Sequence, residues 1–237
     1  MKQRAELIVA LDTPSRDKAL DLVRALRGQV SLFKVGMELF TAAGPSVIRD
    51  LKGLGAEVFL DLKFHDIPNT VARACAEAAK LGVAMVDVHL SGGAAMLRRA
   101  ADEMEAVCAM NRLRRPALLG ITVLTSLGEE DLPAVGIGRP PLEQVLALAA
   151  LGKEAGLDGA VASGREIAAL RERCGPDFVL VAPGIRPEGS SADDQVRILT
   201  PREAVEAGAN FLVIGRPVTG ASSPAVAARD ILRSIIL

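Results

Sequence analysis

The sequence predicts a (β/α)8 barrel that forms a single domain over residues 1–237, because short apolar segments alternate with longer amphipathic ones. A length of 237 residues is typical of one such domain. Half of the residues are hydrophobic, which allows a large core. The apolar segments have few polar interruptions, as expected of strands buried on both faces of a parallel sheet. The predicted strands are Leu7–Leu11, Leu32–Val35, Glu57–Leu62, Met85–His89, Ala117–Thr122, Gly159–Ala162, Phe178–Ala182 and Phe211–Ile214.

The amphipathic segments between these strands are predicted to be helices. Several follow a capping hydroxyl residue and a proline that favours the first helical turn, in the pairs Thr13-Pro14, Thr200-Pro201 and Ser223-Pro224. Several end at a glycine ahead of the next strand, as at Gly55, Gly82, Gly156 and Gly208. The predicted helices include Pro14–Leu26, Thr70–Leu81, Ala94–Asn111, Pro141–Ala155, Glu166–Arg173, Pro201–Ala207 and Pro224–Ile235.

A doubly wound open sheet is the alternative fold, because it shows the same alternation of strands and helices. Such a sheet would be expected to carry a GxGxxG motif after its first strand, where this chain has Asp12-Thr13-Pro14. The least regular segments, 125–139 and 184–200, follow the fifth and seventh strands. A barrel places its active-site loops at these ends of its strands.

Composition argues against a nucleic-acid or membrane partner. The chain has 28 Lys and Arg against 29 Asp and Glu, and it contains six Phe but no Trp or Tyr for base stacking. The first apolar run, Leu7–Leu11, is too short for a signal peptide or a membrane span. The three cysteines are odd in number and widely spaced, which favours free thiols in a reducing compartment. We therefore expect a cytoplasmic protein.

Charged residues interrupt the predicted strands near their ends, where an apolar barrel interior would not tolerate isolated charges. Asp12 follows the first strand, and Lys34 lies within the second. Asp61 and Lys63 are two residues apart in the third strand and are predicted to share one face. A salt-bridge network that only joins the strands would use the same residues. Two acids and two bases on three adjacent strands favour a catalytic site.

Residues Asp61–Val71 resemble the DxKxxDIPNTV signature of the orotidine 5′-monophosphate decarboxylases. The resemblance covers nearly the whole chain. It includes further segments in the same order: Ala10-Leu11-Asp12, Phe33-Lys34-Val35-Gly36, Leu124-Thr125-Ser126, Ala182-Pro183-Gly184-Ile185-Arg186 and Ile214-Gly215-Arg216-Pro217.

The resemblance implies an enzyme that decarboxylates orotidine 5′-monophosphate to uridine 5′-monophosphate, the last step of pyrimidine synthesis, without a metal or cofactor. It implies that Lys63 donates a proton to C6 and that Asp61 lies beside the substrate carboxylate. Lys34 would pair with Asp61 and contact the ribose, and Asp12 would bind a ribose hydroxyl. A preorganised ammonium suits this chemistry, because it stabilises a carbanion and can then protonate it.

The resemblance also implies a homodimer with shared active sites, in which Asp66 and Thr70 are contributed across the interface. The two histidines, His65 and His89, are expected to be structural. Thr125 or Ser126 would meet the pyrimidine edge, with Thr125 slightly favoured.

The substrate phosphate is expected at the ends of the last two strands. There, Gly215 and Arg216 offer backbone N–H groups and a guanidinium. Arg186 and Gln195, in the loop after the seventh strand, resemble the family's phosphate contacts. The alternatives are a simple turn at Gly215 and a solvated charge at Arg186.

Two rival functions use part of the same pattern. The first is a Mg²⁺-dependent 3-keto-gulonate 6-phosphate decarboxylase or hexulose-phosphate synthase, which shares the DxKxxD core. Those enzymes carry a metal-binding Glu near the end of the second strand, where this chain has Lys34, and a cation there would repel Mg²⁺. The second rival is a non-catalytic phosphate-binding barrel, which has no use for the pair Asp61 and Lys63.

Overall fold

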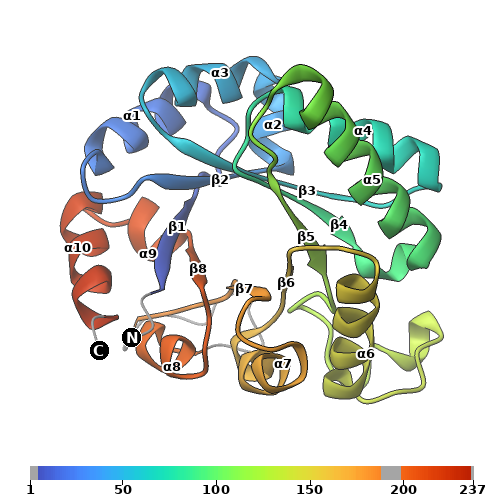
Figure 1. Ribbon diagram of the computed structural model, residues 1–237. Helices are drawn as coiled ribbons and strands as arrows, with labels where there is room; N and C mark the ends of the chain where they lie inside the picture. The colour runs from blue at the N-terminus through green and yellow to red at the C-terminus, as the bar shows by residue number, and fades with distance from the viewer. Residues whose placement is uncertain (1–4, 188–198, 236–237) are drawn as a thin grey trace.

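The computed structural model describes residues 5–187 and 199–235. Eight parallel strands follow one another in chain order and close into a barrel, because β1 pairs with both β2 and β8. Helices surround this barrel on its outside (Figure 1). The predicted fold class is therefore confirmed, and the open doubly wound sheet is excluded by the β1–β8 pairing.

All eight predicted strands are present, with boundaries that differ from the prediction by at most two residues at either end. The strands are β1 Glu6–Ala10, β2 Leu32–Gly36, β3 Glu57–Phe64, β4 Met85–His89, β5 Ala117–Ile121, β6 Gly159–Val161, β7 Val179–Ala182 and β8 Phe211–Ile214.

The seven named helices are also present, but three further helices were not predicted. Two of these, α2 and α3, are short and are separated by Gly44 and Pro45 between the second and third strands. The third, α9, has only four residues. The helices are α1 Arg16–Leu26, α2 Met37–Ala43, α3 Ser46–Gly53, α4 Pro68–Lys80, α5 Gly93–Asn111, α6 Pro141–Glu154, α7 Ile167–Cys174, α8 Pro201–Glu206, α9 Arg216–Thr219 and α10 Pro224–Ser234.

Helices begin where predicted at Thr200-Pro201 and Ser223-Pro224, but not at Thr13-Pro14. Thr200 forms a capping box with Glu203 at the start of α8, as the pair Thr200-Pro201 suggested. The prediction at Thr13-Pro14 was wrong, because the Ser15 hydroxyl accepts the N–H of Lys18 and α1 begins at Arg16. Ser15 thus occupies the capping position that the sequence had suggested for Thr13.

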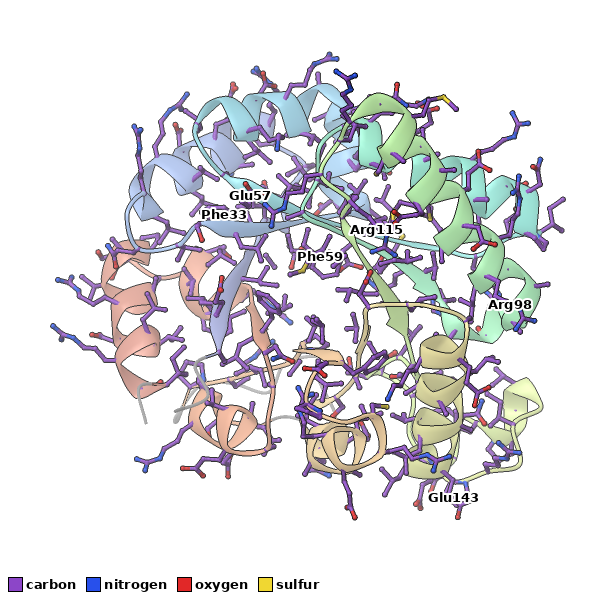
Figure 2. All side chains as sticks on the ribbon, in the orientation of Figure 1. Phe33, Glu57, Phe59, Arg98, Arg115 and Glu143 are labelled. Atoms are coloured by element: carbon purple, nitrogen blue, oxygen red, sulfur yellow. The ribbon has the colours of Figure 1, made fainter. Side chains whose placement is uncertain are left out.

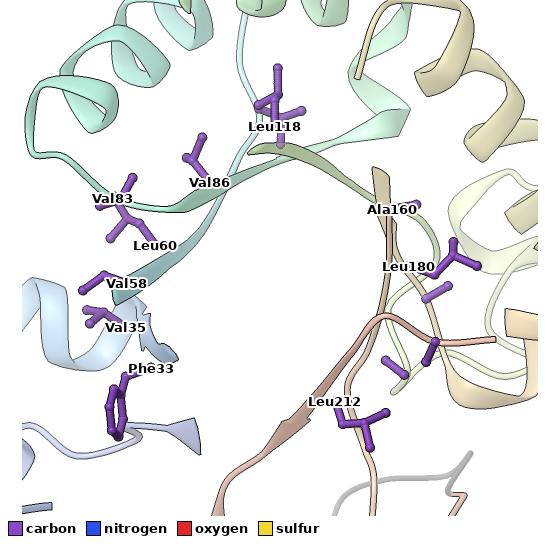
Figure 3. Packing of buried hydrophobic residues seen from close by; sticks show 14 of the residues in the cluster. Phe33, Val35, Val58, Leu60, Val83, Val86, Leu118, Ala160, Leu180 and Leu212 are labelled. Carbon is purple, nitrogen blue, oxygen red and sulfur yellow. The ribbon is translucent and has the colours of Figure 1, made fainter. Parts of the chain in front are cut away.

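Strand alternation divides the apolar residues into two layers. The larger layer lies between the strands and the surrounding helices, and Figure 3 shows Val58, Leu60 and Leu118 on this outer side. The smaller layer fills the barrel interior, where Phe59 is labelled in Figure 2. Its buried members are Ile8, Ala10, Leu32, Phe59, Met85, Leu119, Val181 and Val213. The charged residues of the second and third strands continue this inner face toward the carboxyl ends of the strands.

Within the two described stretches of chain, none of the helices combines the length and the apolar character needed to cross a membrane.

Candidate active site

Lys34, Asp61 and Asp12 form an ion-paired group at the carboxyl ends of β1, β2 and β3. Lys34 is two residues beyond the interior residue Leu32, and Asp61 is two beyond the interior residue Phe59, so strand alternation points both inward. The Lys34 Nζ lies 3.0 Å from Asp12 Oδ1 and 3.3 Å from Asp61 Oδ2. The pairing expected for charges at this position is therefore present.

Lys63 joins this group, but its backbone is not that of a regular strand. Its ammonium is hydrogen-bonded to Asp61 Oδ1. Its φ is 52°, in the left-handed region, and the β3–β4 register shifts between Leu60 and Phe64. The expectation that Asp61 and Lys63 reach the same place is confirmed, because both line one cavity. An irregularity in strand β3 brings the two side chains together, and not the simple alternation of faces on which the prediction was based.

The electrostatics of the group favour an ionised Asp61. Burial alone would raise the pKa of Asp61, but Lys34, a hydrogen bond with Asp87 and the nearby Lys63 together lower it to about 2. Burial would likewise lower the pKa of Lys34, and Asp61 and Asp12 reverse this effect and raise it. Both charges of the Lys34–Asp61 pair are thus maintained at neutral pH.

Asp87, on β4, is a third acid of this region, after Asp12 and Asp61, and the sequence reasoning did not single it out. It is fully buried, and its Oδ1 accepts the backbone N–H of Lys63 at 2.7 Å. Burial, repulsion from Asp61 and a hydrogen bond with Asp61 raise the pKa of Asp87 well above its usual value. The sequence contains a signal that could have identified Asp87 as a site residue. Asp87 is a charge within an apolar strand, two residues beyond the interior residue Met85.

Two adjoining cavities open at this end of the barrel, and Lys34, Pro183 and Val213 line both of them. The first, of about 250 Å³, has an apolar wall with the charged group at one side. It is lined by Lys34, Phe59, Asp61, Lys63, Ile121, Val123, Leu124, Thr125, Val161, Ala162, Pro183 and Val213. The second, of about 200 Å³, is lined by Ala10, Asp12, Lys34, Pro183, Gly184, Arg186, Val213, Gly215 and Arg216.

The second cavity contains the residues predicted to bind phosphate that lie within the described chain. Arg186 is buried, and Arg216 is exposed at the start of α9. A Cβ added to Gly215 would lie 3.3 Å from Asp12 Oδ2, so a glycine keeps this wall open. Arg186 is therefore not the solvated loop charge of the alternative interpretation. Gln195, the remaining predicted contact, lies outside the described residues.

Thr125 and Ser126 are placed differently. Thr125 is partly buried and lines the first cavity, whereas Ser126 is exposed and is not among the lining residues. The rings of His65 and His89 lie 5.3 Å apart near the same end of β3 and β4. Burial lowers the pKa of His89, and the neighbouring His65 and Lys63 lower it further.

Asp66 and Thr70 are not brought to the charged group within one chain. Both are exposed, and neither lines the two cavities as the structure describes them. The carboxylate of Asp66 accepts the N–H of Ile67 at 2.6 Å, just before α4 begins at Pro68. Thr70 lies in the first turn of α4.

The arrangement is suited to chemistry that develops negative charge. The Lys63 ammonium is held by a carboxylate partner at the edge of a largely apolar cavity, where a cation can stabilise negative charge. Across residues 5–187 and 199–235, no three His, Cys, Asp or Glu side chains are grouped as a metal site requires.

The fold and these two cavities define a barrel protein with a lysine–carboxylate group beside a cavity lined by two arginines. The chain belongs to the orotidine 5′-phosphate decarboxylase / HUMPS family, whose sequence model matches residues 5–231.

Relatives named orotidine 5′-phosphate decarboxylase are similar to this chain over almost their full length. The chain is 51% identical to the orotidine 5′-phosphate decarboxylase of Syntrophotalea carbinolica, covering 99% of this chain and 96% of that one. It is 52% identical to the protein of the same name from Moorella thermoacetica, and the match covers 99% of this chain and 94% of that protein. The crystal structure of orotidine 5′-phosphate decarboxylase from Lactobacillus acidophilus superposes with a TM-score of 0.87 at 38% identity, covering 98% of this chain and all of that one.

Proposed function

We propose that this protein is an enzyme that decarboxylates orotidine 5′-monophosphate to uridine 5′-monophosphate and CO₂. The observation that carries the proposal is the position of Lys63, which pairs with Asp61 and lines a cavity next to the one that holds Arg186 and Arg216. A pyrimidine nucleotide has a planar base and a phosphate at opposite ends, and the two adjoining cavities match that shape and charge.

In the proposed reaction, the bond between C6 and the carboxylate breaks, CO₂ leaves, and the electron pair stays on C6. The Lys63 ammonium then donates a proton to C6 and becomes a neutral amine, which recovers a proton from water. The same ammonium stabilises the developing carbanion, because it is already oriented by Asp61 before the reaction begins. Asp61 would lie beside the substrate carboxylate, and Lys34 holds Asp61 in its ionised form.

The remaining predicted residues would bind the rest of the nucleotide. Asp12 and Lys34, which line the second cavity, would contact the ribose hydroxyls. Arg186, Arg216 and the backbone at Gly215 would bind the phosphate, together with Gln195. Thr125 is favoured over Ser126 for the pyrimidine edge, because only Thr125 lines the first cavity.

We further propose a homodimer in which Asp66 and Thr70 complete the site of the partner. Both side chains are exposed beside the apolar Ile67, which is 67% exposed. The test mixes inactive Asp66→Ala chains with inactive Lys63→Ala chains. Partial recovery of activity is expected, because one of the two sites in a mixed dimer would contain both native residues. No recovery under conditions where mixed dimers form would contradict the shared site.

We place this enzyme in the cytoplasm and regard the chain as one catalytic domain. Cys75, Cys108 and Cys174 are all free and buried, which suits a reducing compartment. Cell fractionation with an antibody against the protein checks the location, and recovery in an extracellular fraction would contradict it.

The activity itself is tested by incubating EDTA-treated protein with orotidine monophosphate and following the pyrimidine absorbance. Decarboxylation that persists after chelation is the expected result. Activity that disappears with EDTA and returns with Mg²⁺ would instead support the metal-dependent relatives. Nucleotide binding without turnover would support a non-catalytic phosphate-binding barrel.

A further inference from the structure

The starting observation is the unusual environment of the buried carboxyl of Asp87. Its Oδ1 accepts the backbone N–H of Lys63, whereas its Oδ2 receives no hydrogen bond from the donors in the described part of the chain. The carboxyl of Asp61 lies within hydrogen-bonding reach. Burying a carboxyl costs free energy, and the two groups that Asp87 contacts, the Lys63 backbone and the Asp61 carboxyl, both belong to the charged group.

The second observation concerns the backbone that Asp87 holds. Lys63 has a φ of 52°, and the other non-glycine residue with positive φ in the described chain, Arg112, merely ends helix α5. A left-handed lysine within a strand is strained and persists only when its surroundings hold it in place. Where the β3–β4 register shifts, the N–H of Lys63 bonds to the Asp87 side chain.

We propose that Asp87 is a positioning residue for Lys63, holding its backbone in the left-handed conformation that directs the ammonium onto Asp61 and into the first cavity. The inference rests on the proposed function, since it concerns the same lysine. Asp87 itself does not line either cavity as described, so it would act through Lys63 and not on the substrate.

The protonation state follows from the arrangement of the two carboxyls. Asp61 is paired with both Lys34 and Lys63 and remains ionised, so a proton shared between the two carboxyls resides on Asp87. The protonated Asp87 would then accept the N–H of Lys63 with one oxygen and donate to Asp61 with the other. An asparagine has the same shape, one acceptor and an N–H donor, so it should support Lys63 equally well.

The test compares Asp87→Ala, Asp87→Asn and a matched control at the neighbouring strand end. Thr122→Val is the control, because the buried Thr122 hydroxyl donates to the carbonyl of Val161 and does not line the cavities. For orotidine monophosphate, Asp87→Ala should lower kcat by about 10²-fold with KM changed less than about threefold, since misplaced catalytic groups lose rate at this scale. Asp87→Asn and Thr122→Val should keep kcat within about threefold of the native value.

Two outcomes would overturn the proposal: a native kcat in Asp87→Ala, or an Asp87→Asn variant as slow as Asp87→Ala. If Asp87→Ala does not fold, Asp87→Val fills the site with an apolar side chain and takes its place in the comparison.

Crystal structures of Asp87→Asn and Asp87→Val give a readout that does not depend on activity. We expect positive φ at Lys63 in the asparagine variant and a relaxed, negative φ in the valine variant. Positive φ in both would contradict the positioning role. A native protein inactive on orotidine monophosphate would refute the proposed function, while this structural comparison would still decide the role of Asp87.

Discussion

The two faces of strand β3 differ in what they do for the protein. Leu60 points outward into the apolar layer beneath the helices and is 1% exposed (Figure 3). Its neighbour Asp61 points inward and carries charge at a position where an apolar side chain would pack without a desolvation cost. The outer face therefore stabilises the barrel, whereas the inner face at the mouth carries the ion-paired group that we propose to be catalytic. Substitutions on the two faces should change different measurable quantities.

The largest effect is expected on the inner face, at Lys63. Lys63→Ala removes both the proton donor and the cation beside the reacting carbon, so kcat should fall by about 10³-fold or more. Binding of uridine monophosphate should remain measurable by calorimetry, because the arginine-lined cavity is intact. Lys80→Ala is the matched control, since Lys80 on α4 lies away from both cavities and pairs with the exposed Glu77. Native turnover in Lys63→Ala would end the assignment.

The next effect is expected on the outer face and on stability alone. Leu60→Ala should lower the free energy of unfolding by about 3 kcal/mol, because a fully buried leucine leaves a cavity when it is truncated. The kcat of the folded variant should stay near the native value. Met110→Ala, at a side chain that is 81% exposed, should change stability by less than about 0.5 kcal/mol. Urea unfolding and steady-state kinetics measure the two quantities, and a large loss of kcat in folded Leu60→Ala would undermine the separation of faces.

A substitution at the phosphate end should affect binding more than the chemical step. Arg216→Ala removes a guanidinium from the second cavity, so kcat/KM should fall by about 10²-fold, mainly through KM. Arg24→Ala, on helix α1, removes an exposed arginine that pairs with Asp21 and should leave KM unchanged. An unaltered KM in Arg216→Ala would mean that the phosphate lies elsewhere.

The smallest expected effect is a pH dependence of stability that comes from Asp87. Its pKa is raised by burial and by Asp61, with Lys63 opposing and the thiol of Cys75 also close by. An acid with a raised pKa in the folded state contributes stability that is present below its unfolded pKa and lost as pH rises. Asp87→Asn lacks this loss, so its stability relative to the native protein should increase from pH 5 to pH 6, by at most about 1.4 kcal/mol. Urea unfolding of the native protein and of Asp87→Asn at both pH values measures this change. If Asp87 were ionised at both pH values, the difference in stability between the two proteins would not change with pH, which would contradict the raised pKa.

The sequence predicted the parts of the structure that depend on regular periodicity. Buried strands and capped helices follow from local patterns, and the inward positions of Lys34 and Asp61 follow from the alternation of a strand. The left-handed backbone of Lys63 could not be predicted, because it occurs together with a contact to Asp87, on the next strand, that no local pattern reveals. Helices α2 and α3 were missed because each is too short for a clear pattern beside the Gly44–Pro45 break. The sequence also could not show that Thr125 and Arg186 line two different cavities, because the cavities form only when the barrel closes.

The most direct test of the account is a crystal structure of the protein with uridine monophosphate bound. We expect the phosphate between Arg186 and Arg216, the base in the cavity lined by Thr125, and the Lys63 ammonium within about 3 Å of C6. A nucleotide bound with its phosphate elsewhere, or with C6 turned away from Lys63, would contradict the claim that the charged group and the arginine-lined cavity form one active site.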